Sequence, residues 1–295
     1  MRLFSSEGDV VELPPGHRFP MAKYERVRAE LFRELPALVH EAPRASWDDL
    51  SLAHDAAYLG AVRDGTLPAA EVRRLGLPWS EALVARSRRS TGGTLAALAW
   101  AMEHGAAGHL AGGTHHACRD RGEGFCVFND LAAAALVARR DHGVRRLAVV
   151  DLDVHQGNGT AALLRGDPGA FTLSLHGAKN YPFQKEVSSL DVELPDGCED
   201  ADYLRALDGA LEAVAAHRPE LILYQAGVDA LAGDRLGRLA LTHEGLRRRD
   251  ARVFELTARL GVPLVATLGG GYGRDIEATI AAHKNVYRGL VERLG

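Results

Sequence analysis

Cysteine is scarce in this chain, which has only Cys118, Cys126 and Cys198 among 295 residues. The number is odd and no two of them stand at a close spacing, which argues against the disulfide framework of small secreted domains. A chain of this length buries enough apolar surface to fold without such cross-links. We therefore expect a reducing, cytoplasmic environment.

Long hydrophobic runs are missing as well. Apolar stretches are interrupted before the ~18 residues that a membrane-spanning helix needs, and residues 1–13 carry charges instead of the apolar centre of a signal peptide. A strong charge of either sign is also absent, since the net charge is −4 and the pI is about 6.4. We therefore expect neither a membrane nor a nucleic acid as the main partner.

Five short apolar runs predict buried strands, and helical patterns lie between most of them. The predicted strands are 107–111, 147–150, 170–175, 221–225 and 263–268. The predicted helices are 24–35, 47–64, 80–90, 91–103, 131–140, 202–217, 242–260 and 276–294. This alternation favours an α/β fold with a mainly parallel central sheet. Because no linker rich in Ser or Pro divides the chain, we expect residues 1–295 to form one domain.

Four loops with glycine and polar side chains each follow a predicted strand. They are residues 112–116, 151–159, 226–229 and 269–273. In parallel sheets, ligands bind at the carboxyl ends of the strands. We therefore expect the four loops to meet at one edge and form a site.

The loop 151–159 begins with Asp151, Asp153 and His155. Residues two apart point to the same face of a strand, so the three share one side if the extended geometry persists. Carboxylate oxygens and an imidazole nitrogen suit a divalent metal such as zinc. The alternative is an acidic strand end followed by a surface turn.

Asp229 is the best candidate for a third ligand beside Asp153 and His155, because it is acidic and ends a separate apolar strand. A catalytic zinc usually takes three protein ligands and keeps one position open for water. The alternative role for Asp229 is the N-cap of a helix that starts at Ala230.

The adjacent residues His115 and His116 follow a Gly-Gly turn. They are candidates for general acid–base groups, because histidine titrates near neutral pH. A working base normally has an orienting partner on its other ring nitrogen, and Asp151 and Asn158 are available for that. Two exposed histidines in a polar loop are the alternative.

Two aromatic residues stand in glycine-rich loops. The Tyr272 phenol is suited to donate a hydrogen bond to a polarised carbonyl and to the oxyanion that it becomes. A buried tyrosine bonded to a backbone carbonyl is the alternative. Phe125 is suited to wall a narrow apolar channel, with Gly124 allowing close approach of a ligand. The alternative is a phenylalanine of the core.

These motifs together resemble the histone deacetylase family, in its zinc-dependent branch. The resemblance runs from about residue 14 to 290 and is carried by residues 112–117, 124–129, 151–159, 174–176, 227–241 and 269–272. The string Asp-Arg-Gly-Glu-Gly-Phe-Cys at 120–126 and the Gly-His-Arg-Phe-Pro opening resemble the class IV subgroup and its bacterial relatives. The resemblance implies a three-layer α/β/α fold of the arginase and deacetylase kind.

The resemblance also implies which residues bind metals. Asp153, His155 and Asp229 would hold zinc, which iron(II) replaces in some relatives. A structural potassium ion would lie near a second group of residues at the same strand ends, namely Asp151, Asp153, His155, Ser174 and Leu175.

The catalytic roles follow from the resemblance in the same way. His116 would act as general base and then as acid to the leaving amine, and His115 would be an electrostatic neighbour held by Asp151. Tyr272 would polarise the amide carbonyl. The residues implied to bind the substrate are Gly124, Phe125 and Gly270.

The chain departs from many relatives at Asn158, where they carry an aspartate. An amide oxygen still accepts the ring N–H of His116 and fixes its tautomer. It adds no negative charge, so we expect His116 to be less basic than beside an aspartate. Class IV and some other branches share the asparagine, so an asparagine at this position is compatible with activity.

The leading functional expectation is a zinc-dependent amidohydrolase that removes acetyl or longer acyl groups from the N-acyl-lysine side chains of a peptide. A second is a deacetylase of acetylpolyamines or other small acylated amines. The third is a catalytically silent protein that binds acyl-lysine, which the intact histidine pair, ligand set and Tyr272 disfavour. The sequence leaves the acyl chain length and the oligomeric state open.

Overall fold

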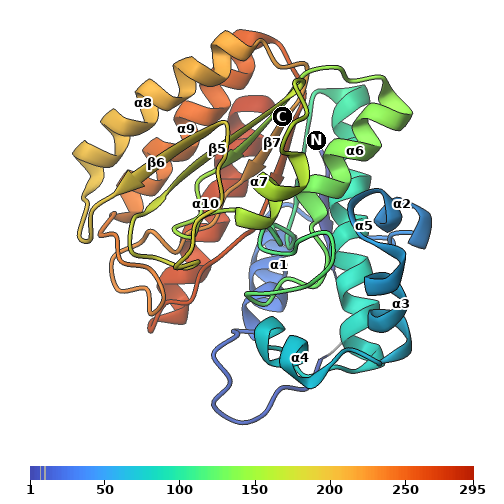
Figure 1. Ribbon diagram of the computed structural model, residues 1–295. Coiled ribbons are helices and arrows are strands. Elements are labelled where there is room, and N and C mark those ends of the chain that lie inside the picture. The colour runs from blue at the N-terminus through green and yellow to red at the C-terminus, as the bar shows by residue number, and fades with distance from the viewer. Residues whose placement is uncertain (7, 10) are drawn as a thin grey trace.

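The centre of the protein is an eight-stranded sheet in which all the described strands run parallel, in the order β2-β1-β3-β8-β7-β4-β5-β6 (Figure 1). The structure is a computed structural model that describes residues 1–6, 8–9 and 11–295. The strands are β1 Leu3–Ser5, β2 Val39–Glu41, β3 Ala106–His109, β4 Leu147–Asp151, β5 Ala170–Gly177, β6 Leu190–Leu194, β7 Ile222–Gln225 and β8 Leu264–Thr267.

Helices cover both faces of the sheet. They are α1 Ala22–Glu34, α2 Trp47–Ala53, α3 Ala56–Asp64, α4 Ala69–Leu75, α5 Glu81–His104, α6 Asp130–His142, α7 Asn158–Leu164, α8 Asp200–His217, α9 His243–Leu260 and α10 Ile276–Leu294. Figure 1 shows α8, α9 and α10 on one side of the sheet and α5 and α6 on the other. None of the helices in the described ranges is long and apolar enough to cross a membrane.

The alternating side chains of the central strands build two cores, one on each face. In β4, Val150 packs into the core beneath α8, α9 and α10, whereas Val149 packs into the core beneath α5 and α6. This alternation is the period of two expected of a strand. Because β4 is covered on both faces, it reads in the sequence as a continuous apolar run. The predicted three-layer α/β/α fold with a parallel central sheet is confirmed.

The boundaries of several elements differ from the prediction. Residues 47–64 form two helices, because His54 and Asp55 are extended. This backbone lets the His54 ring bridge the Cys118 carbonyl and the Asn129 N–H. Residues 80–90 and 91–103 form one helix, α5. The prediction missed β1, β2, β6, α4 and α7, which are only three to seven residues long.

The strand register brings the carboxyl ends of the central strands to one level. Asp151 at the end of β4 pairs with Gln225 of β7, and Gln225 pairs with Thr267 of β8. Thr267 pairs in turn with His109 of β3. The four polar loops that follow these strands therefore start side by side, which places their side chains at one edge of the sheet.

Candidate active site

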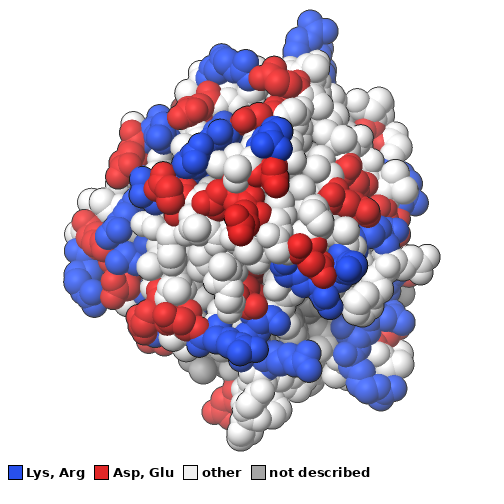
Figure 2. Space-filling model, turned by 90° about the vertical axis from the view of Figure 1, so that its left-hand side faces the viewer, with Lys and Arg blue, Asp and Glu red and all other residues white. Residues whose placement is uncertain are grey.

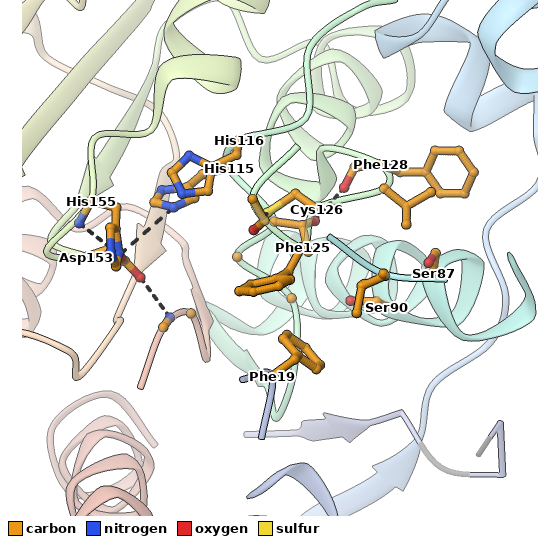
Figure 3. Close-up of a pocket in the computed structure, with 18 of the residues that line it drawn as sticks. Phe19, Ser87, Ser90, His115, His116, Phe125, Cys126, Phe128, Asp153 and His155 are labelled. Carbon is orange, nitrogen blue, oxygen red and sulfur yellow. Dashed lines mark hydrogen bonds and ion pairs between the residues drawn. The ribbon is translucent and has the colours of Figure 1, made fainter. Parts of the chain in front are cut away.

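Two of these loops bring together a buried group of possible metal ligands. Asp153, His155 and Asp229 each offer a ligand atom, and these atoms all lie within 4.8 Å of one another. Nδ1 of His155 is 3.0 Å from Oδ1 of Asp153 and 3.1 Å from Oδ2 of Asp229. Figure 3 shows Asp153 and His155 side by side on one flank of the cavity.

Local hydrogen bonds, and not an extended strand, orient these side chains. β4 ends at Asp151, so the extended geometry on which the shared side of Asp151, Asp153 and His155 depended does not persist to His155. Instead, the His155 N–H donates to Oδ1 of Asp153 and the Val154 N–H donates to Oδ1 of Asp229. No described helix starts at Ala230, so the N-cap role considered for Asp229 is wrong.

Two glycines leave room for the carboxylates. The Gly270 N–H donates to Oδ2 of Asp153 at 2.7 Å. A Cβ at Gly270 would lie 1.9 Å from Oδ2 of Asp229, and a Cβ at Gly227 would lie 2.2 Å from Oδ2 of Asp153. Both distances are far below van der Waals contact. Gly270, predicted to bind substrate, also borders the cavity.

The electrostatics of this group suit a bound cation. Burial and the neighbouring Asp153 carboxylate raise the pKa of Asp229 to about 7. Burial works against a charged His155, but the two carboxylates outweigh it and raise the pKa of His155 to about 10. Two carboxylates and an imidazole, all buried, are three donors of the kinds that hold a divalent metal in proteins. These residues therefore fit a divalent metal.

His115 is held by the end of β4. Its Nδ1 lies 2.6 Å from Oδ2 of Asp151, and its Nε2 lies 4.0 Å from Oδ1 of Asp153. Burial opposes a charged ring, but the nearby Asp151 and Asp153 carboxylates raise the pKa of His115 to about 9. His115 is therefore suited to carry a positive charge beside the metal group.

His116 has the opposite character. Burial and the neighbouring rings of His115 and His155 lower the pKa of His116 well below its usual value, so its ring is neutral near pH 7. Nδ1 of His116 lies 2.7 Å from Oδ1 of Asn158. The amide nitrogen of Asn158 donates to Oε1 of Glu123 at 2.6 Å. Since Oδ1 is only an acceptor, the ring proton must be on Nδ1, which leaves Nε2 of His116 free to take a proton.

Tyr272 borders both the cavity beside the metal group and the wider cavity outside it. Its ring lies edge-on to His155, with 6.4 Å between the ring centres. Its N–H donates to Oδ2 of Asp234, which fixes the backbone. No hydrogen bond joins the Tyr272 hydroxyl to a described residue, so the alternative of a phenol bonded to a carbonyl is wrong. Burial raises the pKa of this hydroxyl well above its usual value, so it keeps its proton.

Phe125 forms the wall between the two cavities. Its ring packs against Phe19 at 5.3 Å and against Tyr272 at 6.2 Å between ring centres, and Figure 3 shows the Phe19 and Phe125 rings next to each other below His116. Phe125 has φ of 67°, a left-handed backbone that only a few per cent of residues other than glycine adopt. Gly124 precedes it with φ of 56°, and a Cβ there would lie 2.6 Å from the His116 ring.

The residues implied to bind potassium also lie close together. Asp151 and Ser174 are paired across β4 and β5, and Leu175 follows in β5. The Asp153 N–H donates to Oδ1 of Asp151. Ser174 Oγ lies 2.9 Å from Nδ1 of His176. The potassium site itself stays a prediction.

Sequence reasoning missed Lys23 and Glu123. Lys23 is a fully buried residue of α1, and its Nζ donates to the carbonyls of Gly269 and Gly271. It therefore anchors the loop that carries Gly270 and Tyr272. The Glu123 carboxylate accepts a hydrogen bond from the Asn158 amide. The signal for Glu123 in the sequence was its position between two glycines, Gly122 and Gly124.

The comparison with known proteins decides the family of the chain. Residues 17–287 match the model of the histone deacetylase domain. The protein belongs to the histone deacetylase family. It is 41% identical over 285 residues to an uncharacterized protein of Picosynechococcus sp., covering 95% of this chain and 94% of that one. It is 33% identical over 296 residues to histone deacetylase 2 of Arabidopsis thaliana, covering 95% of this chain and 76% of the relative.

The fold agrees with this assignment. The crystal structure of an HDAC homolog complexed with SAHA superposes with a TM-score of 0.84 at 25% identity, covering 99% of this chain and 84% of that one. Histone deacetylase family membership makes this chain a deacetylase-like amidohydrolase, an enzyme that hydrolyses acyl amides. The class IV subgroup stays a prediction.

Proposed function

We propose that this member of the histone deacetylase family is a zinc-dependent deacylase that removes acetyl or longer acyl groups from the ε-amino group of lysine side chains in peptides. The observation that supports the proposal most directly is the meeting of Asp153 and His155 with Asp229, because Asp153 and His155 line a cavity together with His116 and Tyr272. Zinc is the metal that these donors suit best, with iron(II) as the second candidate.

Asp153, His155 and Asp229 would hold the metal, which supplies a Lewis acid that polarises the amide carbonyl and acidifies water. His116 takes a proton from the attacking water at Nε2, because this nitrogen is unprotonated in the tautomer that Asn158 imposes. The same nitrogen then donates the proton to the leaving amine. A ring that stays neutral near pH 7 is suited to the first of these steps.

The remaining side chains stabilise charge and exclude water. The Tyr272 hydroxyl keeps its proton and donates a hydrogen bond to the oxyanion that develops on the carbonyl oxygen. The charged His115 ring offsets the negative charge of the nearby carboxylates. The Phe125 ring borders both cavities and lines the apolar passage through which the methylene groups of the substrate side chain pass.

The proposal is tested with an acetyl-lysine peptide and a matched series of longer acyl chains. Protein stripped of metal should lose hydrolysis, and one equivalent of Zn²⁺ or Fe²⁺ should restore it. His116→Ala is the control, because it should bind the metal normally and yet hydrolyse none of the peptides. Elemental analysis verifies that the metal has been removed. Full activity of this metal-free protein would overturn the proposal. Inactivity after reloading, with Zn²⁺ and with Fe²⁺ in turn, would also overturn it.

A further inference from the structure

We propose that the outer cavity selects acyl-lysine peptides with acidic residues beside the acylated lysine, and that it disfavours cationic acyl amines such as acetylpolyamines. The inference rests on the proposed deacylase function. The outer cavity shares His116, His155 and Tyr272 with the inner cavity beside the metal group. A peptide whose acylated side chain reaches these residues therefore has its neighbouring residues in the outer cavity.

The described lining of the outer cavity has five exposed basic residues and no acidic one. They are Arg18, Arg74, Lys179, Arg235 and Arg238. These residues come from the loop before α1, the end of α4, and the loops after β5 and β7. Four separate segments of the chain thus contribute positive charge to one cavity.

This gathering of positive charge is local. The chain as a whole has a net charge of −4. Figure 2 shows acidic and basic side chains interspersed over most of the face drawn there, with basic side chains gathering towards its lower edge. The positive lining of the outer cavity is therefore not a consequence of a basic protein.

Most of the charge is also free to meet a ligand. Lys179 and Arg238 share one partner, Asp196, at 3.7 and 3.2 Å. In contrast, no described carboxylate lies within the 4.0 Å ion-pair distance of Arg18, Arg74 or Arg235. Arg235 donates to the Tyr272 carbonyl at 2.9 Å, which holds its side chain beside the cavity without neutralising its charge.

Guanidinium groups recognise carboxylates by paired, charge-assisted hydrogen bonds. Asp or Glu residues next to the acylated lysine would meet these groups, whereas Arg or Lys residues would be repelled. An acetylpolyamine carries ammonium groups only a few bonds from its amide, so its charge would lie among the same cations. The positive cavity thus separates the peptide substrate from the small-amine alternative.

The test compares kcat/KM for peptides that differ only in the residues flanking an acetyl-lysine, with acidic, neutral or basic flanks, together with N-acetylputrescine. In low salt, we expect kcat/KM for the peptide with acidic flanks to exceed that for the neutral peptide by roughly three- to tenfold, which is the effect that two exposed ion pairs allow. The basic peptide and the acetylpolyamine should be hydrolysed slowest. At 0.5 M NaCl the differences should shrink, because salt screens exposed charges.

Charge-reversal variants assign the effect to the cavity. Arg18→Glu combined with Arg74→Glu should abolish or invert the preference for acidic flanks. Arg259→Glu is the control, since this exposed residue lies in the last turn of α9, pairs with Glu212 outside the outer cavity, and should leave the preference unchanged. Thermal unfolding curves establish that all variants fold.

The outcomes separate this inference from the function on which it rests. If no acyl-lysine peptide is hydrolysed by the metal-loaded protein, the deacylase proposal fails and the inference fails with it. If all peptides are hydrolysed at equal rates, or basic flanks are preferred, the deacylase proposal stands and the inference is overturned. An unchanged preference in the double variant would also overturn it.

Discussion

Asn158 links His116 to Glu123 through the two ends of its amide. Oδ1 faces Nδ1 of His116 at 2.7 Å and Nδ2 donates to Glu123 at 2.6 Å. Because the carboxylate accepts from Nδ2, the amide cannot turn around. The Glu123 carboxylate therefore contacts the Asn158 amide, and the amide separates it from the His116 ring.

This relationship predicts how Asn158 can be replaced. Asn158→Asp alone would place a second buried carboxylate against that of Glu123. Because the two would repel each other, we expect the free energy of unfolding to fall by roughly 2 kcal/mol or more. Adding Glu123→Gln should restore stability, since the new amide donates to the introduced carboxylate. Urea unfolding of the wild type and both variants measures this. A single variant as stable as the wild type would contradict the arrangement.

The double variant also predicts a change in pH dependence. A carboxylate in contact with the His116 ring favours its charged form and raises its pKa. The base is active when neutral, so activity is lost as pH falls through this pKa. We expect the acid limb of the kcat/KM profile to move up by about one pH unit or more. An acid limb at the same pH in the double variant and the wild type would argue against His116 as the base.

Tyr272→Phe removes a hydroxyl without changing the metal group. We expect kcat to fall on the order of 10²–10³-fold, as loss of one oxyanion donor does, with the metal content unchanged. Steady-state kinetics and elemental analysis of the same sample provide the two readouts. Wild-type kcat would remove the role given to this hydroxyl, and loss of metal would show that the effect is indirect.

Gly270→Ala places a methyl group where Oδ2 of Asp229 lies, at 1.9 Å. We expect metal affinity to drop by at least tenfold, because the carboxylate must move. Gly209→Ala is the control: Gly209 lies on the exposed face of α8 with open space around it, and alanine should raise stability by about 0.5–1 kcal/mol there. Titration with Zn²⁺ in the presence of a competing chelator measures the zinc affinity of both variants. Equal affinities would contradict the packing described.

His54 predicts a loss of stability in acid. Burial lowers the pKa of His54 to about 4, and its ring accepts from the Asn129 N–H at Nε2, where a proton would have to bind. The unfolded state takes up the proton first, so the contribution is complete above the unfolded pKa of about 6.5 and is lost as pH falls towards 4. Once the pH is below 4, the free energy of unfolding has fallen by roughly 3 kcal/mol through this histidine. His54→Gln should make unfolding less dependent on pH in this window, and an identical pH dependence in both proteins would refute the assignment.

Much of the fold could be predicted from the sequence because the five central strands are covered on both faces. Such strands appear as continuous apolar runs, and Leu147–Asp151 is the clearest. The candidate ligands could be found for the same reason, since Asp153 and Asp229 each follow such a run. By contrast, β1 and β2 have three residues each, too few for a period of two to be visible.

Other features depend on contacts that no local pattern encodes. Lys23 is a single lysine in α1, and its importance comes from carbonyls almost 250 residues away. The prediction divided α5 after residue 90, whereas Gly92 and Gly93 lie inside one continuous helix, where the Pro43 carbonyl and the His109 ring occupy the space that side chains would need. The positive outer cavity is likewise formed by four segments that only the fold brings together.

The most direct test of the account is the metal content of the purified protein and of Asp229→Asn, measured by elemental analysis after dialysis against excess Zn²⁺. Asp153, His155 and Asp229 should hold one equivalent of zinc in the wild type. The variant should retain well below half an equivalent at the same free zinc concentration. One equivalent in both proteins, or none in the wild type, would contradict the central claim.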